Sequence, residues 1–118
     1  MKRLLALVPA VLFSTAALAQ EVPEAAKKDL WCGIAFGIIS ADVPADASDE
    51  DKALAKQFAD GSVMLIERAT AAHMEAGYDE AGFATYKTEQ QAHVLTNMGG
   101  PAEEQDYKYE DCAPLIGL

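Results

Sequence analysis

The stretch LWCGIAFGIIS, residues Leu30–Ser40, is the most apolar part of the chain after its first two dozen residues. Apolar residues recur in it three and four positions apart, which predicts a helix from Pro23 to about Ile39 or Ser40. Phe36 lies off the main apolar face, so we expect the helix to be buried on more than one side. With about 11 apolar residues it is too short to span a membrane, which takes roughly 20.

Cys32 lies inside this stretch, and Cys112 is the only other cysteine. An even number of cysteines in an oxidising compartment predicts a disulfide bond. The two do not form a C-x-x-C motif, so a thioredoxin-like redox pair is not indicated. A bridge between them would close a loop of about 80 residues and stabilise the fold by nearly 4.7 kcal/mol in the chain-entropy model. We therefore interpret the bridge as structural.

The first residues have the features of a secretory signal peptide. Two basic residues precede an apolar run from Leu4 to Phe13, and Ala17-Leu18-Ala19 matches the A-x-A cleavage signature. The alternative is an N-terminal membrane anchor, for which the apolar run is short. We predict a signal peptide over residues 1–19, cleaved near Ala19-Gln20. The mature protein would then lie in the periplasm, or be secreted, without membrane association.

The chain after the predicted signal peptide is strongly acidic. It holds all 19 acidic residues and seven of the nine basic ones, which gives a formal charge of −12. This charge argues against nucleic acid and anionic lipid as partners, because both bind to positive protein surfaces. It permits a cationic partner, such as a basic protein, a basic peptide or metal ions. The alternative is that the charge serves only solubility.

Two more helices are predicted downstream. Ser48 is followed by three acidic residues, which predicts a capped helix start and a helix from Asp49 to Ala76. Gly61, in the middle of this helix, marks either a close helix crossing or a break. Asp79 can cap a third helix, from about Glu80 to Asn97, which is the least apolar of the three.

The segment after Pro101 is polar and has room for only a turn or two of helix around Cys112. The bridge would pin it across the first helix, where Gly33 and Gly37 allow a neighbouring backbone to approach closely. We predict an all-α fold, a small antiparallel bundle of three main helices with a C-terminal arm or short fourth helix stapled by one disulfide. It forms a single domain over residues 20–118, which we expect to be a monomer.

The motifs of common enzyme and metal sites are missing from the sequence. His73 and His93 are the only histidines, and neither lies in an H-E-x-x-H or similar spacing. There is no G-x-S-x-G turn, no Gly-rich phosphate loop and no C-x-x-C-H haem motif. We therefore predict no catalytic residue, no metal site and no cofactor, and a protein that is not an enzyme.

Five side chains are candidates for a small pocket or a partner-binding patch, because aromatic residues are favoured in such places. They are Trp31, Tyr86, His93, Tyr107 and Tyr109. The alternative for Trp31 is that it packs against the disulfide inside the core.

Trp31-Cys32 in an apolar first helix and Glu110-Asp111-Cys112 near the end resemble a set of small exported bacterial helical proteins that have no assigned function. A looser likeness is to the periplasmic acid-stress chaperones of enteric bacteria, which are also small, helical and held by one disulfide near a tryptophan. The strong negative charge of a rigid, disulfide-stapled bundle predicts a non-enzymatic binding or interaction protein of the cell envelope. The alternatives are a small-ligand or metal binder and an acid-stress-type periplasmic chaperone.

Overall fold

The computed structural model describes residues 21–118, so the predicted signal peptide over residues 1–19 lies outside the described residues. From residue 21 onwards the chain forms helices and no strand. In chain order they are α2 Glu24–Ala41, α3 Asp49–Glu75, α4 Glu80–Met98, the 3₁₀ turn η1 Ala102–Glu104, α5 Tyr109–Cys112 and the 3₁₀ turn η2 Ala113–Ile116. The predicted all-α fold, with three main helices and a short C-terminal one, is confirmed.

The ends of the long helices follow local signals in the sequence. The Ser48 hydroxyl accepts a hydrogen bond from the Asp51 amide at 3.1 Å, which caps the start of α3. The Asp79 carboxylate accepts from the Gly82 amide at 2.7 Å and caps α4 in the same way. After α3 the chain turns at Gly77, whose φ of 114° suits glycine. Both predicted caps are confirmed.

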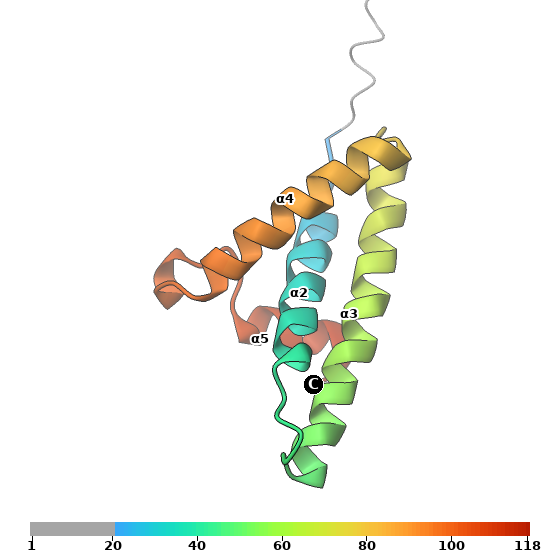
Figure 1. The fold of residues 1–118 in the computed structure, drawn as a ribbon. Coiled ribbons are helices and arrows are strands. Elements are labelled where there is room, and N and C mark those ends of the chain that lie inside the picture. The colour runs from blue at the N-terminus through green and yellow to red at the C-terminus, as the bar shows by residue number, and fades with distance from the viewer. Residues whose placement is uncertain (1–20) are drawn as a thin grey trace, which may run out of the picture.

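Helices α2 and α3 run side by side in opposite directions and enclose most of the core (Figure 1). Eight consecutive residues of α2, from Asp29 to Phe36, are buried, which confirms that this helix is covered on more than one side. A Cβ atom on Gly33 would lie 2.9 Å from Ile66 Cγ1 and 3.3 Å from the Ile66 backbone nitrogen. Glycine at this position therefore sets the close approach of the two helices.

Helix α4 crosses obliquely over α2, with its first turns near the end of α3 (Figure 1). It buries only Phe83 and Val94 along its length. Near its start, His73 of α3 is fully buried, with its ring centroid 4.9 Å from that of Phe83 and 5.4 Å from that of Tyr86. Its Nδ1 lies 2.7 Å from the Ala69 carbonyl oxygen. These aromatic contacts attach α4 to the α2–α3 pair at one end.

The chain after α4, residues 101–118, forms what we call the arm. It returns to α2, where Cys112 is bonded to Cys32 as predicted, with 5.4 Å between the two Cα atoms. It also reaches α3, because a Cβ on Gly61 would lie only 2.5 Å from Ile116 Cγ2. Helix α3 continues unbroken through Gly61, so this glycine marks a close crossing, and the element that crosses is the arm.

Candidate functional site

A surface groove of about 650 Å³ lies where α2, α4 and the arm meet, and we call it the aromatic groove. Helix α2 contributes its first two turns, α4 contributes its middle, and the arm contributes two adjacent residues. The lining residues are Glu24, Lys27, Trp31, Tyr86, Glu89, Gln90, His93, Asp106 and Tyr107. Four of the five side chains predicted for a pocket or partner patch therefore lie in one place.

Helical spacing explains why these side chains share the groove. The α2 residues Glu24, Lys27 and Trp31 are three and four positions apart, so they lie on one face of that helix. On α4 the same spacing joins Tyr86 to Gln90 and His93. The crossing of α4 over α2 brings the two faces together, and the arm closes the third side.

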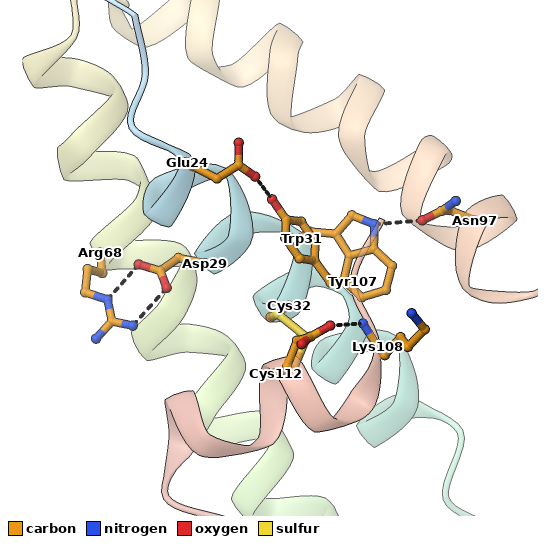
Figure 2. The surroundings of a disulfide bond; sticks show 10 residues. Glu24, Asp29, Trp31, Cys32, Arg68, Asn97, Tyr107, Lys108 and Cys112 are labelled. Carbon is orange, nitrogen blue, oxygen red and sulfur yellow. Dashed lines mark hydrogen bonds and ion pairs between the residues drawn. A yellow bond between two sulfur atoms is a disulfide. The ribbon is translucent and has the colours of Figure 1, made fainter. Parts of the chain in front are cut away.

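Trp31 is both a core residue and a wall of the groove. Only 5% of its surface is exposed, and its indole N–H donates a hydrogen bond to Asn97 Oδ1 at 3.1 Å (Figure 2). The Tyr107 ring meets it edge to face, with 5.7 Å between the ring centroids. Trp31 is thus buried in the core and at the same time lines the groove.

Asn97, near the end of α4, connects three parts of the site. Besides the indole of Trp31, its Oδ1 accepts a hydrogen bond from the Asp106 amide at 2.9 Å. Its Nδ2 donates to the Glu104 carbonyl at 3.2 Å. One amide side chain therefore fixes the arm relative to both helices. Sequence reasoning missed this role, because an asparagine near a helix end carries no signal beyond that of a helix terminus.

Tyr107 ties the arm to the first turn of α2. Its hydroxyl donates a hydrogen bond to Glu24 Oε2 (Figure 2). Burial of the ring raises the pKa of Tyr107 above its usual value, and the hydrogen bond to Glu24 raises it further, since both favour the neutral phenol. The nearby Asp106 carboxylate acts in the same direction. Tyr107 is therefore a neutral hydrogen-bond donor at physiological pH.

The groove carries more negative than positive groups. Glu24, Glu89 and Asp106 contribute carboxylates, and Lys27 contributes a cation. His93 Nε2 lies 2.8 Å from Asp106 Oδ2, and both side chains are about half exposed. Among residues 21–118, no serine, threonine or cysteine lines this groove. Its side chains are equipped to hold a ligand by non-covalent contacts.

The structure places the remaining predicted residue elsewhere. Tyr109 packs against Phe58 of α3, with 6.5 Å between the ring centroids, and does not line the groove. The Tyr109 ring thus contacts α3, whereas the Tyr107 ring contacts Trp31 of α2. The two histidines also lie apart, because His73 is buried behind the aromatic rings whereas His93 faces the groove. Within residues 21–118, no three His, Cys, Asp or Glu side chains are placed to hold a metal ion.

An ion pair between a buried aspartate and a half-exposed arginine, on the other side of α2, was not expected from the sequence. Asp29, which is 7% exposed, accepts two hydrogen bonds from Arg68 of α3, at 2.7 and 2.9 Å (Figure 2). The hydrogen bonds to Asp29 raise the pKa of Arg68 further above its already high value. The pair clamps α2 to α3 and leaves the opposite face of α2 to form the groove.

The helices between residues 21 and 118 include none that is long and apolar enough to cross a membrane. Comparison of the chain with protein-family models, with curated proteins and with solved structures finds no match.

Proposed function

We propose that this protein is exported to the periplasm and acts there as a non-enzymatic binding protein of the cell envelope, with the aromatic groove as its binding site. The observation that carries the proposal is the convergence of Trp31, Tyr86 and Tyr107 from α2, α4 and the arm on one surface hollow. Aromatic side chains are enriched at protein interfaces, where a large rigid ring gives contact area at low entropic cost.

The rest of the proposal is supported by the sequence and by the disulfide. The signal-like residues 1–19 favour export, and a disulfide that closes 80 residues of chain is compatible with an oxidising compartment. Cell fractionation and N-terminal sequencing of the purified protein test this part. A periplasmic protein that begins at Gln20 is expected, and a cytoplasmic protein with residues 1–19 intact would contradict it.

Site-specific photo-crosslinking in cells tests the binding function. The photoreactive residue p-benzoylphenylalanine replaces Gln90, which lines the groove, and in a matched variant it replaces Lys52, an exposed residue of α3 outside the groove. We expect a discrete crosslinked product from position 90 and none from position 52. Equal labelling from both positions, or none from position 90, would count against the groove as a binding site.

A second candidate is a small-ligand binder. The groove volume of about 650 Å³ falls in the range of roughly 300–1,000 Å³ that is typical of small-molecule sites. Thermal-shift measurements with metabolites and metal ions separate the two candidates, because a specific ligand raises the unfolding midpoint as its concentration increases. A ligand that raises the midpoint of the wild-type protein, but not that of a Tyr86→Ala variant, would favour this second function.

A further inference from the structure

We infer that the aromatic groove takes the side chain of a lysine or arginine that a partner protein presents on an extended basic segment. This inference rests on the proposed binding function and adds the chemistry of the partner. It follows from the free carboxylate oxygens in the groove, from its aromatic walls and from a second hollow beside it.

The carboxylates of the groove have capacity for an incoming donor. Glu24 uses Oε2 for Tyr107, and Asp106 uses Oδ2 for His93. Within residues 21–118, no hydrogen bond or ion pair reaches Glu24 Oε1, Asp106 Oδ1 or either side-chain oxygen of Glu89. An ammonium or guanidinium group supplies several N–H donors and a positive charge, so it complements this set.

The aromatic walls favour the same group. A cation over the face of a tyrosine or tryptophan ring is attracted by the ring quadrupole, most strongly where water is excluded. Tyr86 and Tyr107 are each partly exposed, so their rings are accessible to a ligand. The aliphatic stem of a lysine or arginine can pack on the same rings while its charged end reaches the carboxylates. The formal charge of −12 over residues 20–118 would also attract a basic partner at a distance.

A second hollow shows why we infer an extended segment rather than a free amine. It measures about 620 Å³ and shares Tyr86 and Lys27 with the groove, so the two adjoin. Its other walls include Val22, Ala76 and Tyr78, which suit an apolar side chain. Together the two hollows match a segment in which a basic residue is next to an apolar one.

Lys27 gives the inference a distinctive prediction, because it opposes an incoming cation. Replacing it with glutamine should strengthen binding of a basic segment, whereas Glu89→Gln should weaken it. Glu50→Gln is the control for Glu89→Gln, because it makes the same change of net charge at an exposed position outside the groove, in the first turn of α3. All three side chains are exposed, so the variants should fold like the wild type, which circular dichroism can verify.

The experiment titrates the mature protein with a capped pentapeptide of sequence Ala-Lys-Leu-Lys-Ala at low and at physiological salt. Trp31 is the only tryptophan and lines the groove, so its fluorescence reports binding there, and calorimetry gives an independent affinity. We expect saturable binding that is about fivefold weaker in Glu89→Gln and about fivefold tighter in Lys27→Gln, as for one partly exposed charge pair. Glu50→Gln should bind like the wild type.

Several results would overturn the inference. Equal weakening by Glu50→Gln and Glu89→Gln would mean that only the overall charge attracts the peptide. A peptide with glutamate in place of lysine that binds as well would exclude cation recognition. If butylammonium or butylguanidinium bound as tightly as the peptide, the ligand would be a small free cation and not a basic segment of a protein. If crosslinking from position 90 succeeds and the peptide does not bind, the proposed function stands and the ligand class is wrong; if both fail, both proposals fall.

Discussion

Reducing the Cys32–Cys112 bond should remove a large part of the stability of this protein. The bond joins residues 80 positions apart. In the chain-entropy model, closing a loop of that length lowers the entropy of the unfolded chain and so stabilises the folded protein by about 4.5 kcal/mol at 25 °C. A domain of this size has a total free energy of unfolding of about 5–15 kcal/mol. The free energy of unfolding of such a domain falls by about 1.5–2 kcal/mol per M urea, so we expect the unfolding midpoint of the reduced protein to be lower by roughly 2–3 M.

The assay is urea unfolding followed by circular dichroism, with three forms of a protein that comprises residues 20–118. Oxidised and reduced wild type differ only in the crosslink, so their comparison isolates its contribution. A double Cys32→Ala, Cys112→Ala variant adds the loss of two buried sulfur atoms, so it should be less stable than the reduced wild type. A difference between oxidised and reduced wild type below about 1 kcal/mol would refute the reasoning, because the chain-entropy contribution would then be absent.

Three further predictions concern the packing and the site. Gly33→Ala should destabilise the protein by about 1–2 kcal/mol despite the better helix propensity of alanine, because the added methyl group forces α2 and α3 apart. Gly99→Ala is the control and should leave the urea midpoint unchanged, since a Cβ there meets nothing closer than 3.6 Å. Arg68→Met should cost about 2 kcal/mol, since it leaves the Asp29 carboxylate buried and unpaired while Arg68 itself is half exposed; an unchanged urea midpoint would contradict this. Folding raises the pKa of Tyr107, so the neutral phenol contributes fully to stability below the unfolded tyrosine pKa near 10, and this contribution is lost as the pH rises above that value. The free energy of unfolding should therefore fall less steeply between pH 9 and 11 in Tyr107→Phe than in the wild type. Equal pH dependence of the two proteins would contradict this.

The elements of the fold could be predicted because their signals are local. Ser48 and Asp79 cap helices whichever way those helices later pack, and Gly33 indicates a close neighbour without saying which one. The disulfide followed from the cysteine count, since Cys32 had only Cys112 to pair with. These predictions needed no knowledge of the tertiary arrangement.

The candidate site could be predicted only as a set of residue types. Whether the aromatic side chains share one hollow depends on the angle at which α4 crosses α2 and on the path of the arm. Those depend on contacts between distant positions, such as that of Trp31 with Asn97, 66 residues apart, and that of Tyr107 with Glu24, 83 residues apart. Spacing along the chain does not encode such pairs, which is also why Tyr109 was grouped with residues that it does not join.

The arm supplies one wall of the groove, and its Cys112 is also bonded covalently to Cys32 of α2. The proposed binding function therefore depends on formation of the disulfide. While the thiols remain reduced, non-covalent contacts alone hold Asp106 and Tyr107 near α2, and the third wall of the groove is not covalently fixed. We therefore expect the reduced protein to bind the basic peptide more weakly than the oxidised protein does. Equal affinities would show that the groove forms without the disulfide.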